Sequence, residues 1–400
     1  MKQKRAAFLP VLCFFVFPAF LFADNEHPFS TQAPTFEVGF HARGIFANSF
    51  FSLSQITSNS LIIDLDEFGD GFNAFFNIGL TPFYFIYNLN STRSLGFSIG
   101  IDAVGIAEFS DNLLTLSNAV DDQSNVSVAV FFELQFLNSF TVRNIRINAS
   151  PSLFYPLFHI NGRSSVNYTR RETPEGTIID IDYKLRMHTP FSGGNGYSPS
   201  LAALPGIDFN LGAEFPLRED FTVGVDLINL PLVPSLVRSY VEFAGQIGGD
   251  ETLTFDDIEN LFNINEPVHG SRNRIVFRPF KMLAWVDLRP FQDIPINFVP
   301  TLGFAINPFF INMFSLEAGF AARYNWNNIL FPSIGIGYHD RMWINSLGLA
   351  IDINVAQMRF SGAINSIELN LGIDMRSQSF VESWQGAGIG LNFGLKFLIQ

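Results

Sequence analysis

Residues 388–400 read G-I-G-L-N-F-G-L-K-F-L-I-Q, and they decide the fold class more than any other stretch of the chain. Large apolar residues take every second position from Ile389 to Ile399, with mostly small or polar residues between them. Successive side chains of a β-strand point to opposite faces, so this stretch forms a strand with one wholly apolar face. A water-soluble β-sandwich and an outer-membrane barrel both use such strands. The sequence before residue 388 separates these two possibilities.

The composition and the amino terminus indicate an exported chain that faces something other than water. Hydrophobic residues make up 48% of the 400 residues and charged residues 15%, whereas soluble domains carry about 25% charged residues. A basic start at residues 1–5, an apolar run over residues 6–22 and the small residue Ala23 form the pattern of a secretory signal peptide. We predict that residues 1–23 are removed on export.

The mature chain, residues 24–400, has few structural options. No uninterrupted apolar run of about 18 residues follows residue 24, so the sequence predicts no transmembrane helix. Closed β-barrels are the other structure that satisfies every backbone polar group in lipid. The sole cysteine, Cys13, lies in the signal peptide, so disulfides and thiol chemistry are not expected. A net charge of −13 argues against nucleic acid as a partner.

Alternation of apolar and polar residues returns along the whole mature chain, and each alternating segment is about one membrane-crossing strand long. The sequence Thr173-Pro174-Glu175-Gly176 predicts a hairpin turn, because proline comes early and glycine late. We predict an all-β fold, a transmembrane antiparallel β-barrel of about 14 strands with an amino-terminal plug segment. The alternating segments are residues 36–42, 76–80, 95–103, 126–136, 179–187, 207–217, 221–227, 294–306, 314–324, 330–338, 347–355, 367–375 and 389–399.

Charged residues on the polar phase of these strands are predicted to line the interior of the barrel. In residues 179–187 one phase is wholly apolar and the other almost wholly charged, the division that a barrel with lipid outside and water inside needs. Two interpretations stay open: salt bridges that hold a plug in place, or contacts with a passing substrate. The lumen-lining candidates are Glu37, His41, Arg43, Asp180, Asp182, Lys184 and Arg186.

Two segments lose the alternation. Residues 45–56 carry clustered aromatics with Ser and Asn, so we expect a short helix or an inward plug within residues 24–70. Residues 230–274 contain prolines, a Gly-Gly pair and several acidic residues, so we expect a long extracellular loop with a helix around residues 235–244. By contrast, Asn307-Pro308 reads as an ordinary short connection between strands.

The sequence contains no motif that predicts an enzyme. It has no G-x-S-x-G elbow, no H-E-x-x-H and no P-loop. The six histidines are scattered without paired spacing, so neither a metal nor another cofactor is expected. His188 with Ser192 is the nearest local approach to a nucleophile and its base, and a solvated or barrel-lining histidine explains His188 better.

The plan of the chain resembles the FadL-type outer-membrane long-chain fatty-acid transporters, in particular divergent spirochaetal members. The shared features are the signal peptide, the segment before the regular strands, the strand number and the terminal alternating strand. Phe46-Ala47-Asn48-Ser49-Phe50 lies where that family places its plug. The resemblance implies a channel of the cell outer membrane for passive uptake of hydrophobic molecules such as long-chain fatty acids, with membrane lipid and the barrel assembly machinery as partners. It also implies plug or ligand contacts at Phe46, Phe50, Phe51 and Leu53.

Other functions stay open beside the channel. A surface-exposed barrel that acts as an adhesin or structural outer-membrane protein would have a sealed lumen and long structured loops. A barrel enzyme would need a clustered nucleophile and base. In each case residues 389–399 are predicted to close the barrel by pairing with the first strand near residues 36–42, so that no sheet edge stays open.

Overall fold

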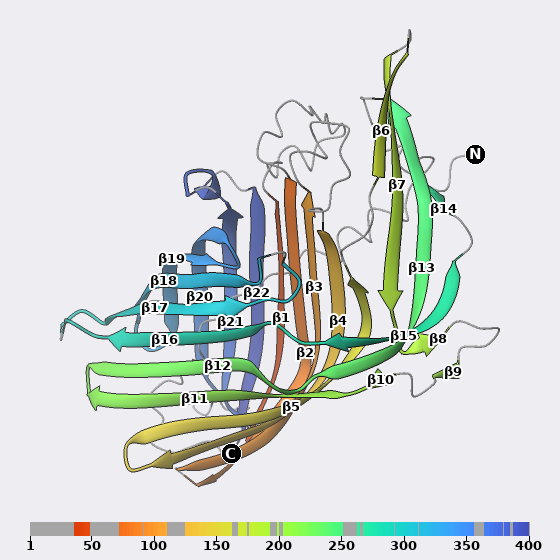
Figure 1. Cartoon of the computed structure of the whole chain (residues 1–400). Coiled ribbons are helices and arrows are strands. Elements are labelled where there is room, and N and C mark those ends of the chain that lie inside the picture. The colour runs from red at the N-terminus through yellow and green to blue at the C-terminus, as the bar shows by residue number, and fades with distance from the viewer. Residues whose placement is uncertain are drawn as a thin grey trace, which may run out of the picture.

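In the computed structural model, most of the described β-strands belong to one large sheet that closes on itself (Figure 1). The structure describes residues 36–48, 72–90, 92–109, 125–161, 167–173, 176–192, 198–199, 203–250, 262–264, 267–291, 293–310, 312–355, 364–378, 380–384 and 387–399. The predicted signal peptide, Phe50, Phe51 and Leu53 lie outside these ranges.

The predicted closing strand is confirmed. β22 (Gly388–Ile399) pairs antiparallel with β1 (Phe36–Asn48), with Phe36 opposite Ile399. The other edge of β22 pairs with β21 (Ile364–Ser377). Both edges of the last strand are therefore hydrogen-bonded, which removes the open sheet edge that lipid does not tolerate.

Fourteen strands form the closed antiparallel ring, as the sequence predicted. An even strand number places the start of β1 and the end of β22 at the same rim. In ring order the strands are β1, β2 (Phe72–Asn90), β3 (Arg93–Phe109), β4 (Asn125–Val142), β5 (Ile145–Asn161), β11 (Gly206–Arg218), β12 (Phe221–Val233), β16 (Phe280–Leu288), β17 (Ile296–Ile306), β18 (Phe314–Tyr324), β19 (Leu330–His339), β20 (Met342–Asn354), β21 and β22.

The two rims of the barrel differ. The rim that holds the start of β1 carries tight two-residue turns, such as residues 143–144 between β4 and β5 and residues 219–220 between β11 and β12. At the opposite rim, the described strand ends are separated by more residues of sequence: β1 ends at Asn48 and β2 begins at Phe72, and β3 ends at Phe109 and β4 begins at Asn125. Bacterial barrels have short periplasmic turns and longer extracellular loops. We therefore call the second rim the outer rim.

A second group of strands extends beyond the ring at the outer rim (Figure 1, upper right). The group consists of β6 (Asn167–Thr173), β7 (Gly176–His188), β10 (Ala203–Leu204), β13 (Ser235–Asp250), β14 (Phe262–Ile264) and β15 (Val268–Val276), and β8 (Phe191–Ser192) pairs with β9 (Ser198–Pro199) beside it. Pairing of β6 with β7, with Thr173 opposite Gly176, confirms the predicted hairpin. We call β6, β7, β13 and β14 the projecting sheet.

The helix expected around residues 235–244 is wrong. These residues belong to β13, which pairs with β7 on one side and β15 on the other. Val237, Val241 and Phe243 alternate with other side chains here, and β-branched and aromatic residues favour paired extended chain. The segment expected as one long loop, residues 230–274, therefore contains ordered strands.

Proline marks the level at which the projecting sheet leaves the wall. Pro205 separates β10 from β11, Pro234 separates β12 from β13, and Pro279 precedes β16. The strand registers place these breaks side by side. Proline has no N–H group to donate to a sheet, so the hydrogen-bond ladder breaks at each position.

The apolar core lies inside the barrel near the outer rim. Its buried members include Ile45, Phe75, Phe131 and Phe154, from β1, β2, β4 and β5. The expected helix or plug beginning at residue 45 is wrong for residues 45–48, because they continue β1 and Ile45 packs in this core.

Candidate functional site

The outer face of the ring is apolar. Leu302, Leu316, Ile334 and Leu347, from four neighbouring strands, are between 55 and 67% exposed. The side chains that alternate with them point inward and include charged groups. This division is that of a barrel with lipid outside and a polar interior.

Arg278 lies at the centre of an ion-pair cluster inside the barrel, beside the proline breaks. Its Nε donates to Asp208 Oδ2 at 2.7 Å, and its Nη2 donates to Glu133 Oε1 at 2.8 Å. Nη2 also donates to Asn229 Oδ1 at 2.7 Å. The Arg278 side chain is 2% exposed. A buried cation is tolerated when carboxylates pair with it and its N–H groups are hydrogen-bonded.

The Arg278 cluster extends to the first strand. Asp102 Oδ2 lies 3.7 Å from Arg278 Nη1, and Asp102 Oδ1 accepts a hydrogen bond from Arg43 Nη2 at 3.2 Å. The cluster thus joins β1, β3, β4 and β11 to the segment that precedes β16. Strands that are far apart in the ring are held together across the interior.

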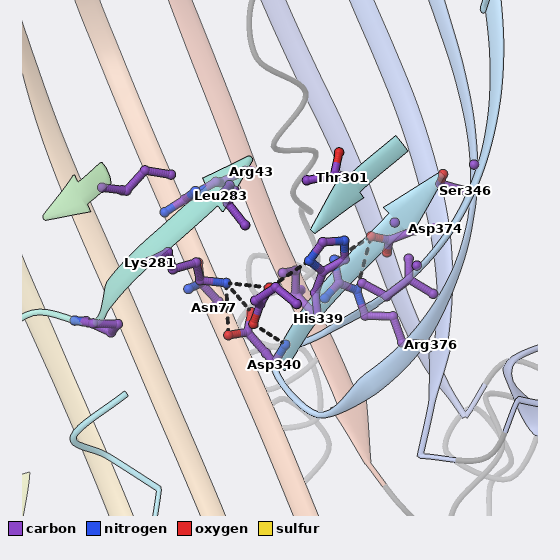
Figure 2. A pocket seen from close by; sticks show the side chains of 18 of the residues that line it. Arg43, Asn77, Lys281, Leu283, Thr301, His339, Asp340, Ser346, Asp374 and Arg376 are labelled. Carbon is purple, nitrogen blue, oxygen red and sulfur yellow. Dashed lines mark hydrogen bonds and ion pairs between the residues drawn. The ribbon is translucent and has the colours of Figure 1, made fainter. Parts of the chain in front are cut away.

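A second cluster surrounds Lys281. Its Nζ donates to both carboxylate oxygens of Asp340 at 3.0 Å and lies 3.6 Å from Glu317 Oε2. Glu317 Oε2 lies 2.6 Å from His339 Nδ1. Figure 2 shows Lys281, His339 and Asp340 directed toward one another in the interior. Lys281 therefore pairs with two carboxylates, and one of them, Glu317, also pairs with His339.

A third ion pair lies on β21, where Arg376 Nη2 donates to Asp374 Oδ2 at 2.6 Å (Figure 2). The other oxygen of Asp374 is buried without a hydrogen-bond partner among the described residues. Asp374 lies opposite Gly390 of β22, and a Cβ atom on Gly390 would come within 1.3 Å of that oxygen. Glycine is required there because the carboxylate occupies the space of a side chain.

Between these clusters lies a cavity of about 180 Å³. Arg43, Arg278, Lys281 and Arg376 line it, and each of these cations is paired with a carboxylate. Its apolar lining includes Ile45, Val104, Phe131, Leu283, Val299 and Ile344. The interior is therefore not filled by side chains at this level, and its wall offers both apolar surface and neutralised charge.

The structure places the seven predicted lumen residues in two separate regions. Arg43 lines the cavity, and His41 Nε2 lies 2.9 Å from Asn392 Oδ1 on β22. Glu37 occupies the same phase of β1 as these two residues. Asp180, Asp182, Lys184 and Arg186 lie on β7, which pairs along most of its length with β6 and β13 rather than with a ring strand.

Phe46 is the one predicted plug or ligand residue that the structure describes. It lies on β1, is 38% exposed and pairs with Ile389 in the outward phase of β22. This position turns its side chain toward the outer face of the barrel. The predicted plug is not shown by the described part of the chain.

The residues around the cavity are not recognisable from local sequence patterns. Arg278 stands in a break between strands, Asp340 lies in a tight turn, and Lys281 is one of two charged residues in the mostly apolar strand β16. Period-two patterns give no sign that these three residues line one cavity, because each pairs with side chains from distant strands. The proline after Arg278 was the one local signal, since it ends a strand beside a charge.

Further observations on the described ranges concern metal-binding groups and the environment of His188. Among the described residues no group of three His, Cys, Asp or Glu side chains is placed to hold a metal ion. His188 packs against the rings of His159 and Tyr240. In the same ranges, no helix is long and apolar enough to cross a membrane.

The chain resembles known proteins in its three-dimensional structure but not in its sequence. The sequence matches no protein-family model and no curated protein. A crystal structure of a Pseudomonas aeruginosa FadL homologue aligns over 92% of this chain and 93% of that chain, with a TM-score of 0.51 and 9% identity. The Pseudomonas putida toluene transporter TodX aligns over 93% of this chain and 91% of its own, with a TM-score of 0.48 and 10% identity. The Ralstonia pickettii toluene transporter TbuX aligns over 92% of this chain and 90% of its own, with a TM-score of 0.48 and 10% identity. The chain therefore has the closed barrel fold of the FadL homologue, as its sequence resemblance implied.

Proposed function

We propose that this protein is a channel of the outer membrane for passive uptake of hydrophobic molecules. The observation that carries the proposal is a cavity with an apolar and charge-neutralised lining inside a barrel whose outer face is apolar. The FadL homologue that shares the barrel fold supports the proposal, because hydrophobic uptake is the function that the resemblance to FadL-type proteins implies. Residues 1–23 act in this proposal as the signal peptide that directs export, and mass spectrometry of the mature chain tests that cleavage.

Long-chain fatty acids are one candidate substrate, and neutral apolar molecules are another. The four cations that line the cavity already have carboxylate partners. A fatty-acid carboxylate would have to compete with those partners, because a cation pairs most strongly with the anion held in place beside it. Neutral apolar molecules meet no such competition.

Uptake into liposomes tests the proposal. Liposomes that contain the folded barrel and empty liposomes receive a long-chain fatty acid, a neutral hydrocarbon of similar length or a small sugar. We expect the barrel to accelerate entry of at least one hydrophobic molecule and not of the sugar. Equal rates with and without the barrel for both hydrophobic molecules would refute the proposal.

The projecting sheet favours a second candidate, a surface-exposed barrel that binds host or neighbouring molecules. This sheet stands beyond the outer rim and is built from paired strands (Figure 1). An adhesin places such ordered structure where a partner can reach it. Shortening the β6–β7 hairpin should abolish surface binding in that case, and it should leave uptake unchanged if the protein is a channel.

A further inference from the structure

Residues 307–310, the first part of the turn between β17 and β18, fold into the barrel instead of standing at the rim. Phe309 is 3% exposed and Phe310 is 8% exposed, and both belong to the core inside the ring. Connections between strands normally run over the surface, since their backbone groups need water or other partners. A turn that buries two phenylalanines inside a barrel therefore needs an explanation.

The two rings reach the far side of the lumen. Phe310 stacks on Phe75 of β2 with ring centroids 6.1 Å apart. Phe309 contacts Phe131 of β4 at 6.3 Å and His159 of β5 at 5.6 Å. In the order of the ring, β2 lies half way round from β17. The turn thus spans the lumen and packs against the opposite wall.

Hydrogen bonds and a cation–π contact also hold the turn against that wall. Asn125 Nδ2 of β4 donates to the Phe309 carbonyl oxygen at 2.7 Å and to Glu108 Oε2 at 2.9 Å. Arg341, from the next turn at the outer rim, lies 5.1 Å over the Phe310 ring and 3.5 Å from Glu108 Oε1. These contacts satisfy a buried carbonyl group and add a cation–π contact.

The turn is also ordered within itself. Asn307 Oδ1 accepts a hydrogen bond from the Phe309 N–H at 3.1 Å, and the Asn307 N–H donates to the Met313 carbonyl oxygen at 2.7 Å. Side-chain bonds of this kind fix a turn locally. These two hydrogen bonds lie within the turn and do not depend on its contacts with the opposite wall.

We propose that Phe309 and Phe310 form the gate of the lumen and determine which solutes pass. An apolar molecule that enters from the outer rim can replace the contacts between these rings and Phe75 or Phe131. Ions and small polar solutes cannot replace them, and hydrophobic constrictions exclude water and ions. The gating role rests on the proposed channel function, whereas closure of the lumen by the turn does not.

Truncation of both rings tests the closure. In planar bilayers, the Phe309→Ala/Phe310→Ala barrel should conduct ions at least about tenfold better than the wild type, because the apolar constriction is gone. Phe314→Ala is the matched control, since Phe314 follows the same turn but is 57% exposed. The β-sheet signal in circular dichroism checks that each variant is folded. Equal conductance of the folded double variant and the wild type would overturn the proposal.

Cross-linking tests whether the turn must separate from the opposite wall for a solute to pass. In a Cys13→Ser background, the Phe309→Cys/His159→Cys variant is treated with a short bis-methanethiosulfonate reagent. The reagent forms one disulfide with each cysteine as two sulfinate groups leave, which joins the turn to β5, and a reductant cleaves both disulfides. We expect the cross-link to reduce uptake of a neutral hydrocarbon to the rate of empty liposomes, and cleavage to restore it. Each single cysteine variant, treated identically, controls for the reagent. Unchanged uptake after complete cross-linking would overturn the gating role.

The two experiments separate the gate from the channel. A wild-type barrel that admits no hydrophobic molecule would refute the proposed function and, with it, the gating role. Raised ion conductance of the double variant would in that case still support closure of the lumen by the turn. Hydrocarbon uptake that ends on cross-linking supports both.

Discussion

Two groups of ion pairs have nearly the same distances but opposite surroundings. Inside the barrel, Arg278 lies 2.7 Å from Asp208 and is 2% exposed. On the projecting sheet, Glu242 lies 2.8 Å from Lys184 and 2.6 Å from Arg186, and these two cations are 49 and 31% exposed. Burial, and not distance, decides how much the loss of such a pair destabilises the protein. Water screens the exposed charges, whereas a buried charge depends on its partners for stabilisation.

The largest expected effect is the loss of the buried cation. Arg278→Met keeps much of the side-chain length but leaves Asp208 and Glu133 buried without their partner. We expect the free energy of unfolding to fall by about 3–5 kcal/mol. Denaturant unfolding of the barrel in lipid vesicles measures it. Arg278→Lys, which keeps the charge but not the planar fork, should lose less. A fully stable Arg278→Met barrel would contradict the buried-charge interpretation.

A charge introduced on the lipid-facing surface of the barrel would have neither water nor an oppositely charged partner. Phe393 lies on the outward phase of β22, next to the ring of Phe40 at 5.9 Å. Phe393→Lys should lower the free energy of unfolding by about 2–4 kcal/mol if the residue lies at mid-membrane. Asn392→Asp, on the inward face of the same strand, should lower the free energy of unfolding much less. Equal losses would show that the faces of β22 are assigned wrongly.

A smaller effect is expected where a buried carboxylate restricts its neighbour. Gly390→Ala places a methyl group where Asp374 Oδ1 now lies, at 1.3 Å. The carboxylate must move, and overpacking of this kind costs about 1–3 kcal/mol. Gly394→Ala on the same face is the control, because its nearest neighbour would be 3.4 Å away. Equal stability of the two variants would place Asp374 elsewhere.

The smallest effect should come from the projecting sheet. Glu242→Gln removes the exposed ion pairs and should change the free energy of unfolding by less than about 1 kcal/mol. Hydrogen bonds from Lys184 and Arg186 lower the pKa of Glu242. Their stabilisation is therefore complete above the ordinary carboxyl pKa and is lost as the pH falls through the lowered value. Limited proteolysis between pH 3 and pH 7 measures the stability of the projecting sheet. Faster cleavage of the sheet as the pH rises would contradict the expected pH dependence.

The ring was largely predictable from the sequence because its strands follow a local rule. Residues 314–324 alternate along their length, and the structure gives β18 the same bounds. The pairing of β22 with β1 followed from the need to close both sheet edges. Each of these inferences uses a pattern within one strand or a requirement of the membrane.

The cavity and the inward turn were not predictable in the same way. Arg278 meets Glu133 across a separation of 145 residues, and nothing in either local sequence records the contact. Phe309 and Phe310 looked like part of an ordinary connection after Asn307-Pro308. Two adjacent large apolar residues in a strand connection were the available signal, since a turn exposed to water has little use for them.

An apolar gate should let hydrophobic molecules, and not polar ones, through this barrel. The most direct measurement is the entry of a neutral hydrocarbon and a small sugar into the same liposomes that contain the folded wild-type protein. The structure predicts that the barrel accelerates hydrocarbon entry and leaves the sugar outside. Equal acceleration of both solutes, or of neither, would contradict it.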